Sequence, residues 1–119
     1  MKTIFVVDDS DTNLLKAGEA LEAQYRVLTM PSAAKMFMLL EKMTPDLILL
    51  DIEMPEMSGF EAIQRLKSPD SPAKNIPIIF LTGHSDAATQ TQGRELGAED
   101  FVAKPFTAPD LLARVARYV

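Results

Sequence analysis

Five short runs of apolar residues constrain the fold of this chain more than any other feature of its sequence. They span Thr3–Val7, Tyr25–Thr29, Leu47–Leu50, Ile78–Leu81 and Phe101–Ala103. Most of them are continuously apolar rather than alternating, which is typical of strands covered on both faces, as in a parallel sheet. The pattern therefore predicts five strands buried in the middle of one domain.

The segments between these runs carry apolar residues at helical spacing. The shared faces are Leu14, Leu15, Gly18 and Leu21; Ala33, Phe37 and Leu40; Phe60, Ile63 and Leu66; and Leu111, Leu112, Val115 and Val119. The segment Asp86–Leu96 is polar and predicts a weaker helix that faces solvent. Helix-capping residues precede four of the segments, namely Ser10 or Asp11, Ser32, Ser58 and Thr107. The alternation predicts an α/β protein with an open, right-handed, doubly wound parallel sheet.

Length and composition exclude several classes of protein. The 119 residues fit a single domain over 1–119, either standing alone or forming part of a longer protein. The chain has no cysteine, which excludes disulfides and thiolate metal sites. No apolar segment approaches the ~20 residues that span a bilayer, and the start MKTIFVVDDS is no signal peptide. The formal charge of −5 argues against nucleic-acid binding by this domain. We therefore expect a cytoplasmic protein without membrane or nucleic-acid contacts.

Polar residues follow four of the five predicted strands. Asp8 and Asp9 follow the first strand, Asp51 the third, Thr82 the fourth and Lys104 the fifth. Ligands of open parallel sheets bind beyond the carboxyl ends of the strands. If the first strand is central, the three acids converge there, and two carboxylates ~5 Å apart at an effective dielectric of ~20 repel by about 3 kcal/mol. The cluster must therefore share protons or hold a cation.

The residue types at this edge indicate metal-assisted phosphoryl chemistry. Oxygen ligands without His or Cys favour a hard ion, Mg²⁺ or Mn²⁺. Asp51 is a candidate nucleophile, because a carboxylate can accept a phosphoryl group. The cation and Lys104 would neutralise the charge on the phosphoryl oxygens, and the hydroxyl of Thr82 could hydrogen-bond to one of them.

Four stretches of the sequence resemble the receiver domain of two-component response regulators. They are VVDDS at 6–10, LLDIEMPEMSG at 49–59, FLTG at 80–83 and GAEDFVAKPF at 97–106, in the family's order and spacing. The resemblance implies a flavodoxin-like (βα)5 three-layer sandwich with strand order 2-1-3-4-5. It also implies a phosphorelay signalling module that catalyses only its own phosphorylation and dephosphorylation. Its partner would be a sensor histidine kinase or a phosphotransfer protein.

The resemblance assigns roles to the acids. Asp51 would be the phosphoacceptor. Asp9 would bind Mg²⁺ directly, Asp8 would bind it through water, and the backbone carbonyl of Glu53 would be a further ligand. Glu53 and His84 would border the path of the attacking water and tune the lifetime of the phosphoryl group, with a net effect that the sequence leaves open.

The resemblance also implies a switch. Thr82 and Lys104 would hold phosphoryl oxygens, Gly83 would leave room beside them, and the Lys104–Pro105 peptide bond would be cis. On phosphorylation Thr82 would move toward the phosphate and Phe101 would rotate inward. That motion would repack the face formed by the fourth helix, the fifth strand and the fifth helix.

Charged residues on that face have two interpretations. They are Glu99, Asp100, Arg114 and Arg117. The simpler interpretation is a solvated charged surface, where ion pairs contribute little. The other is a homodimer formed through this face on phosphorylation, in which acids of one chain meet arginines of the other.

Two other functions fit the architecture. An aspartyl-phosphate phosphatase or phosphotransferase would place its nucleophile and acid two residues apart on the first strand, whereas Asp8 and Asp9 are adjacent. It would also need a cap domain to select substrates. A flavin-binding electron carrier would need a Ser/Thr/Gly-rich phosphate loop, whereas DDSD at 8–11 is acidic and would repel phosphate. We therefore prefer the signalling module.

Overall fold

The computed structural model describes residues 1–84 and 86–119 and confirms the predicted α/β fold. Five parallel strands form one sheet in the order β2-β1-β3-β4-β5. The strands are β1 (Thr3–Val7), β2 (Arg26–Met30), β3 (Leu47–Asp51), β4 (Ile78–Thr82) and β5 (Asp100–Ala103). The helices are α1 (Asp11–Leu21), α2 (Ala33–Leu40), α3 (Gly59–Leu66), α4 (Ala87–Glu95) and α5 (Ala108–Val115). None of the helices in the described ranges is long and apolar enough to cross a membrane.

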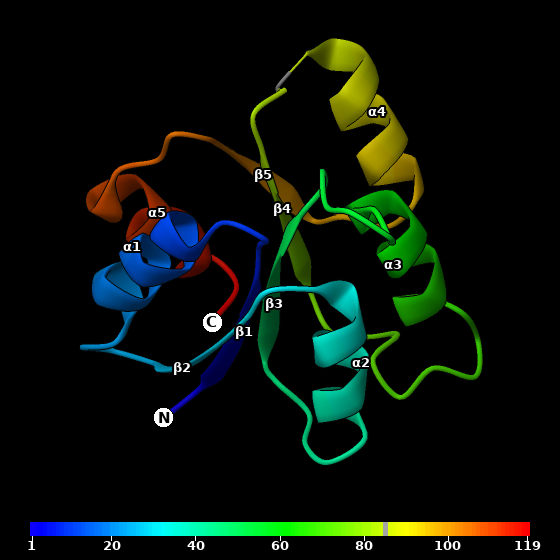
Figure 1. Cartoon of the computed structure of the whole chain (residues 1–119), viewed down its shortest axis with the longest axis horizontal. Coiled ribbons are helices and arrows are strands. Elements are labelled where there is room, and N and C mark those ends of the chain that lie inside the picture. Colours follow the sequence, from blue (N-terminus) through cyan, green and yellow to red (C-terminus); the bar gives the residue numbers. More distant parts are fainter. Residues whose placement is uncertain (85) are drawn as a thin grey trace.

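Helices cover both faces of the sheet, which explains the continuous apolar runs. Figure 1 shows α1 and α5 on one side of the sheet and α2, α3 and α4 on the other. In β1, Ile4 and Val6 are buried in the core on the α1 and α5 side, while Phe5 and Val7 are buried on the opposite side. Because successive side chains point to opposite faces, every residue of such a strand must be apolar.

Three strands depart by one residue from the predicted bounds at polar positions. β3 extends to Asp51, β4 extends to Thr82, and β5 begins at Asp100. Each of these residues pairs in the ladder, and hydrophobicity alone does not reveal backbone pairing. β2 is shifted by one residue, because the N–H of Tyr25 donates to Leu21 at the end of α1 and the ladder starts at Arg26.

The prediction that Leu15 lies on the buried face of α1 is wrong. Its side chain is 63% exposed, whereas Ala17 and Leu21 are fully buried. α1 packs onto β1, β2 and α5, and the side of the helix that carries Leu15 lies toward the open edge of the sheet beside β2. A helix next to an edge strand has less of its surface covered than a central one.

Side-chain caps fix the helix starts where the sequence places them. The hydroxyls of Ser10, Ser32, Ser58 and Thr107 each accept the backbone N–H three residues further on. Ser58 forms a reciprocal capping box with Glu61. These caps orient the helices that follow the strand ends.

The helix α4 is held to the sheet by very little, as its polar sequence predicts. Its one fully buried residue is Gly93. A Cβ atom on Gly93 would lie 2.6 Å from Cζ of Phe101, so the helix contacts the ring through its bare backbone. After α4 the chain turns at Gly97, whose φ of 113° is a conformation that favours glycine.

Candidate functional site

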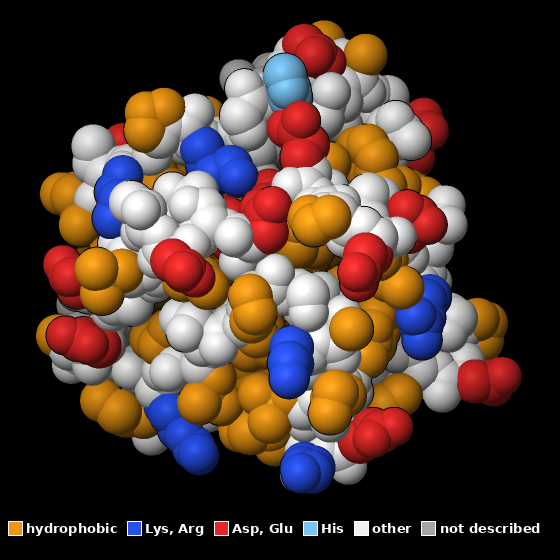
Figure 2. Space-filling model, viewed as in Figure 1, with side chains coloured by type: hydrophobic (Ala, Val, Ile, Leu, Met, Phe, Trp, Pro, Cys, Tyr) orange, Lys and Arg blue, Asp and Glu red, His pale blue; other side chains and the backbone are white. Residues whose placement is uncertain are grey.

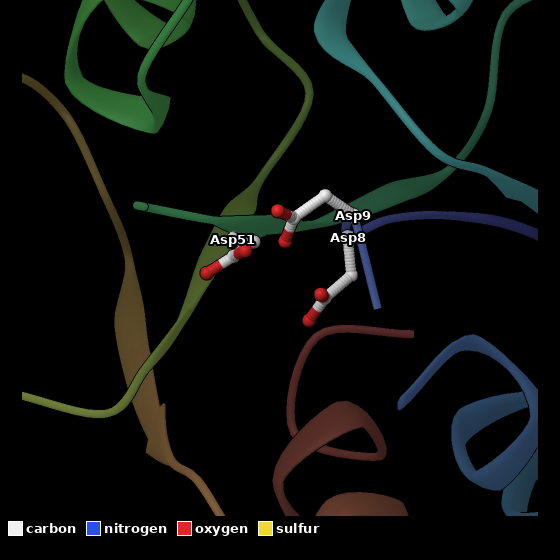
Figure 3. A group of neighbouring side chains, drawn as sticks. All are labelled: Asp8, Asp9 and Asp51. Carbon is white, nitrogen blue, oxygen red and sulfur yellow. The ribbon is translucent and has the colours of Figure 1, made fainter. Parts of the chain in front are cut away.

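The three acids predicted to converge do so at the carboxyl end of the sheet. β1 pairs with β3 with Val7 opposite Leu50, so Asp8 and Asp51 follow side by side on neighbouring strands. Figure 3 shows the side chains of Asp8, Asp9 and Asp51 grouped where these two strands end. One carboxylate oxygen from each lies within 4.8 Å of the others. The strand order creates this cluster, because it places β1 next to β3.

Two of these acids are buried in spite of their charge. Asp8 and Asp51 are 0% and 1% exposed, while Asp9 is open to solvent. Oδ1 of Asp51 accepts the backbone N–H of Glu53 at 3.3 Å and an N–H of Lys104. Oδ2 of Asp51 is buried and has no hydrogen-bond partner among the described residues. A buried polar atom without a partner is costly, so this oxygen is suited to an absent ligand.

The donor set fits a hard divalent cation. Three carboxylates supply oxygen ligands from two strand ends, and exposed Asp9 leaves the cluster accessible. Oxygen ligands beside a solvent opening are what Mg²⁺ prefers, since it keeps several of its waters. The acidic cluster is therefore compatible with the metal site typical of receiver domains.

Lys104 brings a positive charge to the same cluster from β5's end. Its Nζ lies 2.8 Å from Oδ1 of Asp51 and 3.4 Å from Oδ2 of Asp8. The Lys104–Pro105 peptide bond is cis, the geometry that the resemblance implies. Burial alone would lower the pKa of Lys104, but its bonds to Asp51 and the charges of Asp51 and Asp8 outweigh burial and hold that pKa above its ordinary value.

The surroundings of Asp51 act on its pKa in both directions. Burial raises the pKa, the hydrogen bond from Lys104 lowers it, and the charge of Asp8 raises it again, with a result of about 6. A carboxylate with this pKa is largely ionised at neutral pH, and it is less hydrated than an exposed aspartate. Both properties suit a nucleophile.

The sequence did not reveal the groups that orient Asp8. Its Oδ1 accepts the backbone N–H of Ser10 at 2.9 Å, and its Oδ2 accepts Nδ2 of Asn13 at 3.3 Å. Asn13 lies in the first turn of α1, so the cap region of this helix also holds the acid. The signal was present in the sequence as an amide five residues after Asp8, but an amide in a first turn is ordinary.

Glu53 and His84 meet beside the acidic cluster. Nε2 of His84 lies 3.1 Å from Oε2 of Glu53, and both side chains are more than half exposed. Figure 2 shows the single histidine next to an acidic side chain near the top of the view. The sequence singled out each residue separately and did not predict their pairing.

Thr82 is buried beside the cluster with its hydroxyl turned to the following loop. Its Oγ1 donates to the backbone carbonyl of His84 and accepts the backbone N–H of His84, both at 2.9 Å. Gly83 is exposed, and a Cβ added there would meet no other atom within 4 Å. The space next to Thr82 is therefore open toward solvent.

The ring of Phe101 is already turned into the core in this structure. Phe101 is 6% exposed, its ring centroid lies 5.8 Å from that of Phe80, and the guanidinium of Arg94 lies over its other side at 5.3 Å. Gly93 also packs closely against the ring, since a Cβ atom there would lie 2.6 Å from Cζ of Phe101. Sequence reasoning missed Gly93 and Arg94, because a glycine and an arginine in a polar helix give no sign of packing.

The interpretation of Asp100 as part of a solvated surface is wrong. Asp100 is 8% exposed, and its carboxylate accepts Nη1 of Arg114 at 2.8 Å and the hydroxyl of Tyr118 at 2.9 Å. Arg117 lies 3.8 Å from the same group. Asp100, Arg114 and Arg117 therefore pair within one chain and tie β5 to the end of α5.

Comparisons with known proteins identify the family that shares this site. The model of the response regulator receiver domain matches residues 4–116. The phosphate regulon transcriptional regulatory protein PhoB of Pseudomonas aeruginosa is 39% identical over 115 residues, which are 96% of this chain and 50% of that protein. A probable cyclic di-GMP phosphodiesterase of Vibrio cholerae is 42% identical over 113 residues, which are 95% of this chain and 25% of that protein. The chain thus spans a quarter to a half of the length of these relatives.

Solved structures agree with this assignment. The chemotaxis protein CheY4 of Vibrio cholerae superimposes with a TM-score of 0.93 at 29% identity, covering 100% of this chain and 99% of that one. The beryllofluoride-activated receiver domain of DrrB from Thermotoga maritima superimposes with a TM-score of 0.87 at 36% identity, covering 99% and 97%. The acids at the strand ends therefore lie in a fold that these proteins share.

Proposed function

Because this chain belongs to the family of response regulator receiver domains, we propose that it accepts a phosphoryl group on Asp51 and acts as a switch in a two-component phosphorelay. The donor is a sensor histidine kinase or a phosphotransfer protein, since the family in general works with a histidine kinase. One observation carries the proposal: one oxygen of buried Asp51 binds Lys104, while the other, beside Asp8 and Asp9, has no hydrogen-bond partner among the residues that the structure describes.

We infer that Mg²⁺, or Mn²⁺ in its place, is held by Asp8, Asp9, Asp51 and the backbone carbonyl of Glu53. The clustered carboxylates support this ligand set, and so does Oδ2 of Asp51, which has no partner in the described part of the chain. When bound, the ion supplies positive charge that neutralises phosphoryl oxygens. Lys104 would contribute a second positive charge beside Asp51.

Asp51 is the nucleophile in the proposed transfer. A carboxylate oxygen forms the new bond to phosphorus while the P–N bond of the donor's phosphohistidine breaks. The leaving imidazole nitrogen keeps the electron pair and takes a proton from solvent. Lys104 then contacts a phosphoryl oxygen, and the hydroxyl of Thr82 turns from His84 toward another, with Gly83 leaving room for it.

The response to phosphorylation is proposed to appear on the face formed by α4, β5 and α5. Phe101 already occupies the inward position, so phosphorylation would favour this arrangement over an outward one rather than create it. Homodimerisation through this face on phosphorylation stays a prediction. Asp100 would not take part in it, because Arg114 and Tyr118 of the same chain already hold its carboxylate.

The contact between the side chains of Glu53 and His84 is proposed to influence the phosphoryl lifetime. The backbone N–H of Glu53 binds Asp51, and the backbone of His84 binds Thr82, so the pair links the two loops that flank the phosphorylation site. In this proposal the two side chains border the path of the attacking water.

The domain is proposed to work in the cytoplasm as a regulator rather than as an enzyme with an external substrate. Its relatives include a transcriptional regulatory protein and a probable phosphodiesterase, which are longer than this chain. The output that this domain controls would be a separate unit, joined to it or in another protein.

The proposal is tested by incubation with acetyl phosphate and Mg²⁺ followed by intact mass measurement. We expect one labile phosphoryl adduct on the wild type, none on Asp51→Asn, and the full adduct on Asp70→Asn, which changes an exposed aspartate in the α3–β4 loop. An adduct that persists in Asp51→Asn would contradict the proposal. Steady release of phosphate from many esters would favour the phosphatase.

A further inference from the structure

The sheet edge formed by β2 has a hollow on each of its two faces. The first, of about 340 Å³, lies between β2 and α2 and is lined by Met30, Pro31, Lys35, Met38, Leu39 and Lys42 among others. The second, of about 450 Å³, lies between β2 and α1 and is lined by Asp11, Leu14, Leu15, Gly18, Glu19 and Glu22 among others. β2 pairs only with β1 among the described strands, so the edge between the two hollows is open. We call this surface the β2 edge.

The rims of the two hollows carry charges of opposite sign. On α1 and its end, three exposed acids line the second hollow, namely Asp11, Glu19 and Glu22. On α2 and its end, exposed Lys35 and Lys42 line the first hollow, with Glu41 as the one acid there. In Figure 2, the lower half of the view shows lysine or arginine side chains around a cluster of hydrophobic ones near α2, while acidic side chains lie over α1 at the left. The β2 edge is therefore acidic on one face of the sheet and basic on the other.

Three residues of the β2 edge are poorly explained by the packing of a single chain. Leu15 and Met38 are 63% and 59% exposed, and they are the two large hydrophobic side chains within the described helices that are open to this degree. Gly18 lies in the middle of α1, although a Cβ there would meet no atom within 4 Å. Glycine in the middle of a helix is unfavourable relative to alanine. No close contact within the ranges that the structure describes requires a glycine at this position. Gly18 therefore leaves a flat helix surface that another molecule could cover.

We propose that a second copy of this chain covers the β2 edge, through a two-fold axis parallel to β2. Such a rotation exchanges the two faces of the sheet, so it places α1 of each copy beside α2 of the other. The acidic rim of one copy then faces the basic rim of the other, twice in the same dimer. The contact is self-complementary, as a two-fold interface must be.

The positions of the residues along α1 and α2 are consistent with this arrangement. α1 and α2 begin beyond the carboxyl ends of β1 and β2 and run back along the sheet, so the axis brings their first turns together. Asp11 then lies toward Lys35 of the second copy, and Glu22 toward its Lys42. In the middle, Met38 of the second copy lies over Gly18, and Leu15 enters the hollow beside α2. An unbranched methionine side chain is well suited to a flat helix surface.

The alternative two-fold arrangement is disfavoured by charge. Antiparallel pairing of two β2 strands keeps each face of the sheet on its own side, so α1 would meet α1 and acids would meet acids. Repulsion between like charges at such a contact costs affinity and specificity. Only the axis parallel to β2 pairs the two rims.

This dimer goes beyond the proposed phosphorylation switch and is independent of it. β2 and β5 are the two opposite edges of the sheet, so the dimer leaves α4, β5 and α5 free. We expect the dimer in the unphosphorylated protein, and beryllofluoride with Mg²⁺ should not be needed for it. If Asp51 did not take up phosphate, the proposed dimer through the β2 edge would still stand. If the chain did not dimerise, the proposed phosphorylation of Asp51 would still stand.

Sedimentation equilibrium on charge-reversed variants tests the proposal. In Glu22→Lys and in Lys42→Glu the two symmetry-related contacts between positions 22 and 42 become like-charge contacts, and we expect each variant alone to dimerise about tenfold more weakly than the wild type. An equimolar mixture of the two variants pairs every reversed charge with its complement, so it should regain the wild-type affinity. Asp70→Lys and Lys74→Glu change charge equally at exposed positions away from the β2 edge, and they should leave dimerisation unchanged.

Substitutions that change the size of the side chain at Gly18 test the same interface independently of charge. A Cβ atom at Gly18 would meet no atom within 4 Å, and the larger side chain of Gly18→Leu adds bulk to this flat surface. We therefore expect Gly18→Leu to be a folded monomer by circular dichroism and sedimentation, whereas Gly18→Ala should still dimerise. A wild type that stays monomeric up to millimolar concentration would overturn the proposal. So would a dimer that Gly18→Leu and both charge reversals leave intact, because that dimer would use another face.

Discussion

At the scale of single residues, the buried aspartates Asp100 and Asp51 are held in opposite ways. Asp100 has both carboxylate oxygens hydrogen-bonded, to Arg114, to Tyr118 and to the backbone N–H of Phe101. Asp51 has one oxygen bonded and the other without a partner among the described residues. Burial favours the neutral form of each, but the bonds of Asp100 prevail and its pKa is lowered, whereas the pKa of Asp51 is raised to about 6. Asp100 thus stabilises the fold, while Asp51 is kept ready for a ligand.

The role of Asp100 leads to a pH-dependent stability. Its pKa is lower in the folded than in the unfolded state, so its contribution is complete at neutral pH and is lost as the pH falls through the folded-state pKa. We expect Asp100→Asn to lower the free energy of unfolding by about 1–3 kcal/mol at neutral pH. The difference from the wild type should shrink in acid, as measured by urea unfolding across pH. A difference that is the same at every pH would contradict this role, and exposed Asp70→Asn should show no difference larger than about 0.5 kcal/mol.

At the scale of secondary-structure elements, α4 and β5 meet through a glycine and an aromatic ring. Gly93 supplies the only fully buried position of α4, and its backbone faces Phe101. Phe101 in turn packs on Phe80 of β4, next to the strand end that carries Thr82. A change at the strand ends can therefore reach α4 through one ring, without a large core having to move.

Replacing Gly93 by alanine should show whether its packing against Phe101 outweighs the higher helix propensity of alanine. A methyl group on Gly93 would lie 2.6 Å from Phe101, so Gly93→Ala should destabilise the protein by about 1–3 kcal/mol despite the better helix former. Gly18→Ala is the matched control, because a methyl group there meets no atom and should stabilise α1 by about 0.5–1 kcal/mol. Both values are measured by chemical denaturation at a concentration below dimerisation. Equal changes in the free energy of unfolding for the two substitutions would show that the contact between Gly93 and Phe101 does not affect stability.

The elements themselves were largely predictable from the sequence, whereas some of their contacts were not. Continuous apolar runs gave all five strands to within one residue, since both faces of this sheet are covered. Leu15 was misplaced because apolar spacing does not say which sheet edge stays open. Asp100 was misplaced because the sequence does not show whether a charged residue finds partners such as Tyr118 eighteen positions away.

At the scale of the whole molecule, strand order produces the candidate site. β1 lies between β2 and β3, which gathers Asp8, Asp9 and Asp51 from positions far apart in the chain. Their convergence was predictable, because parallel strands end at one edge. The pairing of Glu53 with His84 and of Asn13 with Asp8 was not, because it depends on loop conformations that have no periodic signal.

Binding of a divalent ion at this convergence should stabilise the whole domain. A ligand at a hundredfold excess over its dissociation constant adds about 2.7 kcal/mol to the free energy of unfolding. We expect Mg²⁺ to raise the melting temperature relative to chelator, and Asp9→Asn to lose most of that increase. Asp9 is exposed, so its replacement should alter the metal-free melting temperature little. An Mg²⁺ effect of equal size in Asp9→Asn would place the ion elsewhere.

The central claim is that strand-end acids hold one divalent ion and make Asp51 the phosphoacceptor. It is tested most directly by a crystal structure of the chain with Mn²⁺ and beryllofluoride, using the anomalous signal of manganese to locate the ion. The account predicts one manganese peak among Asp8, Asp9 and Asp51, with beryllium bonded to a carboxylate oxygen of Asp51 and one of its fluorides against Lys104. Manganese bound at another surface, or beryllofluoride absent from Asp51, would contradict it.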